Sequence, residues 1–94
     1  MTQLERDIEQ KLRKMVEARG GHCLKFTSPS SAGVPDRIVL LPGGRVIFVE
    51  LKRPKGGELS ELQKWWGRRL WSLGLKYWTI WNHQDLDDFK EVML

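Results

Sequence analysis

Apolar and polar residues follow a helical pattern at the start of the chain. Through the first sixteen positions an apolar residue recurs every three or four residues, with charged residues between, which predicts an amphipathic helix. Thr2 followed by Glu5 is typical of a capping box at a helix start, and Gly20 and Gly21 are typical of a helix end. We therefore expect the first helix over residues 2–19.

The pattern then changes to that of three short strands. Residues 22–27 alternate in character, and residues 36–41 and 45–52 are rich in β-branched and apolar side chains. The segment 28–35 is rich in Ser, Pro and Gly, which favours a loop. Because only a Pro-Gly-Gly turn at 42–44 separates the last two strands, we expect them to pair as an antiparallel hairpin.

The second half of the chain predicts a helix, a strand and a closing helix. Ser60 and Gln63 are spaced as a second capping box, and Gly74 is placed to end that helix. The apolar face expected for this helix consists of Leu62, Trp66, Leu70 and Leu73. Residues 76–81 predict a fourth strand, and residues 85–94 a short helix.

The predicted fold class is α/β, in the order α-β-β-β-α-β-α with a mixed sheet flanked by helices. A length of 94 residues predicts one domain over 1–94, and a net charge of +4 favours a polyanionic partner such as nucleic acid. The single cysteine, Cys23, excludes an internal disulfide. No apolar run approaches the roughly 18–20 residues of a membrane span, so we expect a cytoplasmic protein with no membrane partner.

Asp36, Glu50 and Lys52 are the candidate catalytic residues. Residues two apart on a strand share a face, so Glu50 and Lys52 point the same way. Paired residues of an antiparallel hairpin have a constant sum of numbers, and a turn centred on Gly43 sets that sum at 86, twice 43. Asp36 therefore faces Glu50, and two carboxylates and an ammonium converge at one end of the hairpin.

This group of side chains is suited to phosphodiester hydrolysis. Neighbouring carboxylates repel each other unless a cation lies between them, and Mg²⁺ prefers oxygen ligands. Such an ion can polarise a phosphodiester and acidify a bound water, while Lys52 can help deprotonate that water or stabilise charge on the phosphate. Each fragment also has a structural interpretation, as a surface ion pair or as a Pro-Asp turn. No P-loop is present, so we expect no nucleotide cofactor.

The same residues resemble a known nuclease signature. Pro35 and Asp36, followed by Glu50, Leu51 and Lys52, are similar to the PD-(D/E)XK motif. Segments 33–37, 49–54 and 59–63 resemble the VRR-NUC family within that superfamily, and the likeness covers nearly the whole chain. The resemblance implies a restriction-endonuclease-like core and a DNA nuclease dependent on Mg²⁺ or Mn²⁺.

The resemblance also implies roles for individual residues. It implies that Asp36, Glu50 and the backbone carbonyl of Leu51 bind the metal, and that Lys52 is the catalytic base or charge stabiliser.

A glutamate of the first helix is also implied near the metal. Glu9 matches best by its distance from Gly20, and Glu5, one turn earlier, is the alternative. Gln63 has two compatible interpretations, as a helix cap and as a residue near the active site.

Basic and hydroxyl side chains near the signature are candidate contacts to DNA phosphates. The loop ahead of Asp36 carries serines where related sequences often carry basic residues, so its electrostatic attraction for DNA is weaker. The candidates are Lys25, Ser30, Arg37, Arg53 and Lys55. Each of the four basic residues is equally well interpreted as a solvated charge.

Five tryptophans gather in the second helix and the last strand. They could fill the core, stack on unpaired bases or anchor an interface between subunits. We expect a homodimer with Trp65, Trp66 and Trp71 at its interface. A twofold dimer could cut two strands symmetrically, which favours branched or four-way-junction DNA, as in repair or recombination.

Two other hypotheses stay open from the sequence. The chain could be a non-catalytic module that binds nucleic acid with the nuclease fold, or a structural dimerisation domain that ignores nucleic acid. The first would bind DNA without cleaving it, and the second would not bind it. Because no helicase or recognition domain is fused to it, we expect the chain to come from a phage or mobile element.

Overall fold

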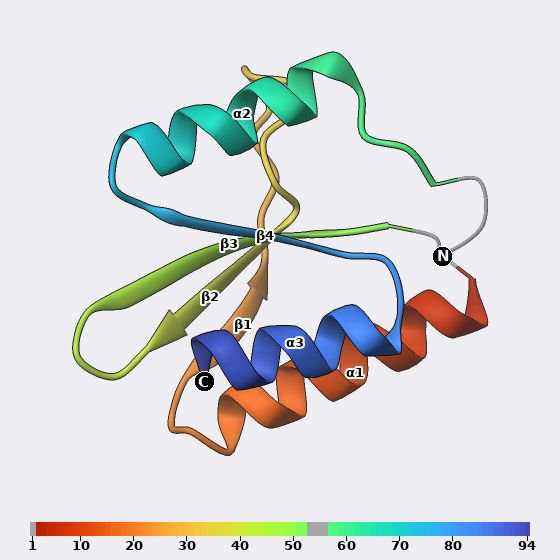
Figure 1. Cartoon of the computed structure of the whole chain (residues 1–94), viewed down its shortest axis with the longest axis vertical. Coiled ribbons are helices and arrows are strands. Elements are labelled where there is room, and N and C mark those ends of the chain that lie inside the picture. The colour runs from red at the N-terminus through yellow and green to blue at the C-terminus, as the bar shows by residue number, and fades with distance from the viewer. Residues whose placement is uncertain (1, 53–56) are drawn as a thin grey trace.

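The computed structural model describes residues 2–52 and 57–94. Its elements are α1 (Gln3–Glu17), β1 (His22–Lys25), β2 (Arg37–Leu41), β3 (Arg45–Leu51), α2 (Glu61–Ser72), β4 (Lys76–Ile80) and α3 (His83–Met93). The expected order of elements and the α/β class are confirmed (Figure 1). None of the helices in this part of the chain is long and apolar enough to cross a bilayer.

The four strands form one mixed sheet in the order β1-β2-β3-β4. The β1–β2 and β2–β3 pairs are antiparallel, and the β3–β4 pair is parallel. Arg37 pairs with Val49 and Leu41 with Arg45, which confirms the predicted hairpin register. The tight turn forms because Gly43 and Gly44 take φ angles of 83° and 75°, in the left-handed region that glycine adopts at little cost.

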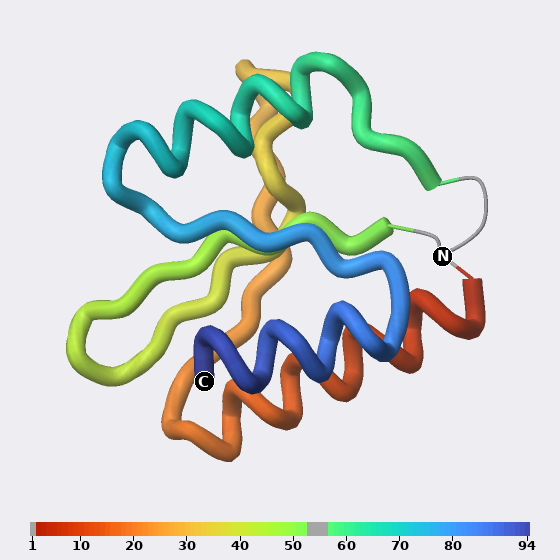
Figure 2. Tube along the Cα trace, viewed as in Figure 1, coloured from red at the N-terminus to blue at the C-terminus, as the bar shows by residue number. Residues whose placement is uncertain are grey.

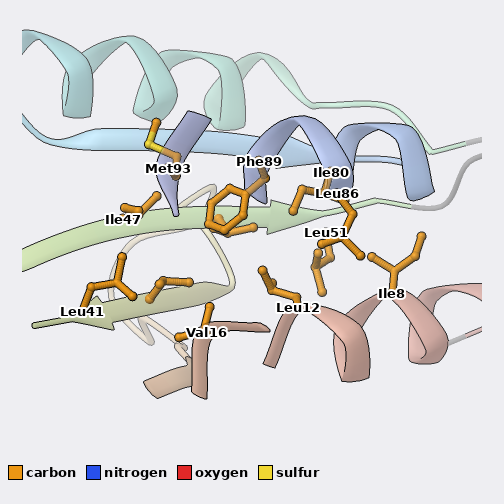
Figure 3. Close-up of a cluster of buried hydrophobic side chains, with 12 residues drawn as sticks. Ile8, Leu12, Val16, Leu41, Ile47, Leu51, Ile80, Leu86, Phe89 and Met93 are labelled. Carbon is orange, nitrogen blue, oxygen red and sulfur yellow. The ribbon is translucent and has the colours of Figure 1, made fainter. Parts of the chain in front are cut away.

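The helices lie on the two faces of the sheet unequally. α1 and α3 run side by side under one face, and α2 lies on the other (Figures 1 and 2). The main core lies between the sheet and the α1–α3 pair (Figure 3). It consists of Ile8, Leu12, Val16, Val39, Leu41, Ile47, Val49, Leu51, Ile80, Leu86, Phe89 and Met93.

The apolar face expected for α2 is wrong for two of its four residues, while Trp66 is half-buried as part of that face. Leu70 is buried, but Leu62 and Leu73 are 45% and 56% exposed. The contact with the sheet centres on Gly67, where a Cβ would lie 2.8 Å from Cε1 of the Tyr77 ring. A glycine lets the helix approach that ring closely, so the larger apolar side chains on either side stay at the surface.

Both predicted capping boxes are confirmed, but α3 begins earlier than expected. Thr2 and Ser60 accept hydrogen bonds from the backbone N–H groups of Glu5 and Gln63. Asn82 caps α3 by accepting from the N–H of Asp85 at 2.8 Å. Asn is among the strongest N-cap residues, so a signal for this earlier start was present in the sequence.

Candidate active site

Asp36 and Glu50 face each other at the open end of the β2–β3 hairpin. The backbone N–H of Asp36 donates to Glu50 Oε2 at 2.9 Å, and the N–H of Leu51 donates to Asp36 Oδ1 at 3.2 Å. These two bonds continue the strand pairing into the side chains, so the register of the hairpin fixes both carboxylates. The structure therefore brings together the two acidic residues that the sequence predicted.

Glu50 points away from the main core, toward α2. Val49 and Leu51 belong to the core, and successive strand residues point to opposite faces. The side chain of Glu50 is only 6% exposed, because the first turn of α2 covers it. Gln63 donates from Nε2 to Glu50 Oε1 at 2.6 Å, and Lys52 Nζ lies 3.7 Å from the same oxygen. Asp36, Glu50, Lys52 and Gln63 thus form one cluster.

Glu50 is an unusual carboxyl group because it is buried beside a second one. Burial, followed by the negative charge of Asp36, raises the pKa of Glu50 from 4.5 to about 7. The hydrogen bond from the N–H of Asp36 and the charge of Lys52 act in the opposite direction and offset this only in part. A group balanced between its two protonation states near neutral pH is typical of functional sites.

The donor set fits a hard divalent cation. A cation between Asp36 and Glu50 would relieve the repulsion that raises the pKa of Glu50, and both residues offer the oxygen ligands that Mg²⁺ and Mn²⁺ prefer. The backbone of Leu51 lies against the Asp36 carboxylate, where the resemblance expects a third ligand. Within residues 2–52 and 57–94, however, no three His, Cys, Asp or Glu side chains come close enough to share an ion.

The structure does not bring Glu9 into this cluster. Its carboxylate pairs instead with Nη2 of Arg37, a residue that points toward α1 because it lies on the same face of β2 as the core residues Val39 and Leu41. Glu5, the alternative, closes the N-terminal capping box of α1 through the N–H of Thr2. The metal-ligand role of the helix-one glutamate stays a prediction.

The five residues expected to contact DNA differ in where the structure places them. Lys25 and Ser30 are exposed, so both stay candidates. Arg53 and Lys55 lie outside the described residues. For Arg37 the expectation needs correction, because its side chain is only 6% exposed and already bonded to Glu9 and Asp36. In this arrangement its guanidinium faces the interior and not a DNA backbone.

Two of the three tryptophans expected at an interface are exposed. Trp65 and Trp71 are each 46% exposed. Trp66 is half-buried, and its indole N–H donates to the carbonyl of Ala32 at 3.1 Å. That bond ties α2 to the loop ahead of Asp36, so Trp66 has a role within the chain.

Two further residues, Tyr77 and Thr79, lie beside Glu50 although no sequence pattern indicated them. Thr79 pairs with Glu50 across the parallel β3–β4 contact, and its hydroxyl donates to the Tyr77 hydroxyl at 3.1 Å. Burial raises the pKa of Tyr77, and the charges of Glu50 and Asp36 add to that effect. Only the pairing of β4 with β3, which depends on tertiary structure, brings these side chains to the site.

Comparison with known proteins supports the sequence motif. No family model matches the chain. A protein of Acyrthosiphon pisum secondary endosymbiont phage 1, described as "Putative nuclease p44", is 46% identical over 82 residues, which are 87% of this chain and 86% of that protein. A solved structure described as "VRR_NUC domain" superposes with a TM-score of 0.88 at 24% identity, over 99% of this chain and 100% of the other.

Proposed function

This chain belongs to the VRR-NUC nuclease family, and from that premise we propose that it is a metal-dependent endonuclease that hydrolyses phosphodiester bonds in DNA. The observation that carries the proposal is the pairing of Asp36 with Glu50 at the end of one hairpin, with Lys52 on the same side as Glu50. The similarity to a phage protein named as a nuclease supports the same conclusion.

The residues divide the chemical work between them. Asp36, Glu50 and the carbonyl of Leu51 would hold Mg²⁺ or Mn²⁺, which when bound polarises the phosphodiester and lowers the pKa of a water molecule. Lys52 would orient that water and stabilise the charge that develops on the phosphate, or, in its neutral form, would take up the proton of the water. Gln63 holds Glu50 in place through the 2.6 Å hydrogen bond.

We also propose that the active form is a homodimer acting on branched or four-way-junction DNA. Support comes from apolar side chains exposed on the side of the sheet that α2 covers. These are Leu24, Leu40, Leu62, Trp65, Trp71 and Leu73. Exposed aromatic side chains such as Trp65 and Trp71 are enriched at protein interfaces, and a twofold dimer would present two sites to two strands.

A cleavage panel tests the nuclease proposal. Single-stranded, duplex, flap and four-way-junction DNA are each incubated with Mg²⁺ or Mn²⁺, and Lys52→Ala is compared with the wild type. We expect metal-dependent cleavage that is fastest on the junction and is abolished by Lys52→Ala with folding intact. Activity that survives EDTA, or full activity in the variant, would contradict the mechanism. Salt-sensitive binding without cleavage would identify a non-catalytic module instead.

Sedimentation equilibrium tests the dimer. Trp71→Glu should shift the protein from dimer to monomer, because it places a charge on the proposed interface. Val92→Glu is the matched control, since Val92 is 65% exposed on α3, on the opposite side of the sheet. A monomeric wild type, or equal effects of the two variants, would contradict the proposal.

A further inference from the structure

Arg37 lies on the same face of β2 as the core residues Val39 and Leu41, where an apolar side chain would be expected. Its guanidinium connects Glu9 of α1 with Asp36, the residue directly before β2. Nη2 pairs with Glu9 of α1, while Nη1 donates to the backbone carbonyl of Asp36 at 2.9 Å and lies 3.3 Å from Asp36 Oδ2. One buried arginine therefore links helix α1 to a residue of the candidate active site.

Stability alone does not explain an arginine at this position. Its Nε is buried and has no hydrogen-bond partner among the described residues, and a buried donor left without a partner costs about 1–3 kcal/mol. A buried ion pair can often be replaced by apolar residues with no loss of stability. The neighbourhood is poorly solvated, since burial raises the pKa of the adjacent Cys23 thiol to about 11.

We infer that Glu9 is a positioning residue that acts on Asp36 through Arg37 and is not itself a metal ligand. The inference rests on the nuclease function proposed above. Glu9 sets where the guanidinium lies, and the guanidinium holds both the carbonyl and the carboxylate of Asp36. The helix-one glutamate thus shapes the site from the opposite face of the sheet.

An arginine suits this role better than a lysine. Its planar guanidinium presents donors in fixed directions, so that one side can bind Glu9 while the other binds Asp36. A lysine ammonium at the same position could satisfy one of these partners but would not hold them at a fixed separation. Removing a group that orients a metal ligand typically lowers metal affinity or activity about 10–100-fold.

The first test needs neither metal nor DNA. In metal-free protein, the ¹³C signal of the Asp36 carboxyl group is compared between the wild type and Glu9→Gln. We expect a clear shift of that signal in Glu9→Gln, in the same direction as in Arg37→Gln. Glu17→Gln is the matched control, because Glu17 is exposed at the end of the same helix, and it should leave the signal unchanged. An unchanged signal in Glu9→Gln would overturn the inference.

The second test is a double-mutant cycle on Mn²⁺ affinity, measured by calorimetry. Glu9→Gln should weaken Mn²⁺ binding about 10-fold in the wild-type background. It should have no further effect in the Arg37→Gln background, because the link from Glu9 to Asp36 through Arg37 is already lost there. The double variant removes both charges together, which limits the cost to folding. An equal loss of affinity in both backgrounds would mean that Glu9 binds the metal directly and would overturn the inference.

The two proposals fail in different ways. A wild type that binds no Mn²⁺ or cleaves no DNA contradicts the nuclease function, while the carboxyl signal of Asp36 still decides whether Glu9 acts on it. If the wild type cleaves DNA but the effects in the double-mutant cycle are additive, the nuclease function stands and only the inference about Glu9 is overturned. A crystal structure with Mn²⁺ bonded to a Glu9 oxygen would have the same consequence.

Discussion

The side-chain amide of Gln63 joins a helix cap to the buried carboxylate of Glu50. Its oxygen accepts from the backbone N–H of Ser60 at 2.8 Å, which leaves the amide nitrogen to donate to Glu50 Oε1 at 2.6 Å. The capping box of α2 therefore decides which end of the amide faces the active site. The two compatible interpretations of Gln63 from the sequence therefore meet in one side chain, which closes the cap of α2 and contacts Glu50.

Gln63→Glu should separate these two roles. Glutamate is equally suited to a capping box, so α2 should keep its N-terminal cap. At the site, however, it replaces a donor with a third carboxylate and raises the pKa of Glu50 further above about 7. We expect the acidic limb of the pH–rate profile to move to higher pH. Glu61→Gln, on the same helical turn but exposed, is the control, and identical profiles for Gln63→Glu and the wild type would contradict the assignment.

The pKa of Glu50 also predicts a pH-dependent stability. Burial raises the pKa of Glu50 to about 7 in the folded protein, from its ordinary value of 4.5 in the unfolded chain. Between these values the folded protein holds a proton that the unfolded chain has lost. The free energy of unfolding in EDTA should therefore fall by on the order of 3 kcal/mol as pH rises from about 4.5 to about 7.

Urea denaturation at several pH values measures this loss of stability. Glu50→Gln should flatten the decline across that range, because the variant has no proton to lose. Glu17→Gln should keep the slope of the wild type, since it removes an exposed carboxylate from α1. A wild type whose stability rises from pH 5 to pH 7 would show that burial of Glu50 has little effect on its ionisation.

Added Mg²⁺ should reverse that loss. A metal ion binds the ionised carboxylates, so its affinity rises with pH, and the increase in melting temperature should be larger at pH 7.5 than at pH 5.5. At ten times its Kd a ligand stabilises the folded state by about 1.4 kcal/mol. Asp36→Asn should remove the effect, whereas Asp87→Asn, an exposed change on α3, should keep it. Equal stabilisation of both variants by Mg²⁺ would indicate binding elsewhere.

The hairpin and its acidic pair could be predicted from sequence because both follow from local rules. A tight turn at Gly43 sets the register, and a period of two residues carries it along the strands to Asp36 and Glu50. Ser60 and Gln63 were likewise recognisable, since a capping box spans only four residues. The fold order followed from the same local signals.

The partners of Arg37 and the packing of α2 could not be predicted in this way. Which charges meet Arg37 depends on where α1 crosses the sheet, and no periodicity within β2 contains that information. The face of α2 depends on a close approach between Gly67 and Tyr77, which are ten residues apart on different elements. A hydrophobic pattern ranks side chains by size and polarity, so it wrongly placed Leu62 and Leu73 in the contact and missed Gly67.

Gly33, in the loop ahead of Asp36, provides a test of how α2 shapes the site. It has a φ of +83°, and a Cβ there would lie 2.7 Å from Leu62 Cγ and 3.0 Å from the Leu62 backbone carbon. Gly43 has the same φ with nothing within 4 Å of its Cβ position. Gly43→Ala should therefore cost only the conformational strain, roughly 1–2 kcal/mol, and leave cleavage unchanged, because it lies at the far end of the hairpin.

Gly33→Ala should cost more, because the steric contact with Leu62 adds to the same strain. It should also lower the rate of DNA cleavage by displacing the loop that leads to Asp36. Adding Leu62→Ala should recover part of the lost stability, since it removes the Cγ contact but not the one with the backbone. Urea denaturation and cleavage rates of the three variants measure these effects. If Gly33→Ala and Gly43→Ala were equally destabilised and equally active, α2 would have no part in holding that loop.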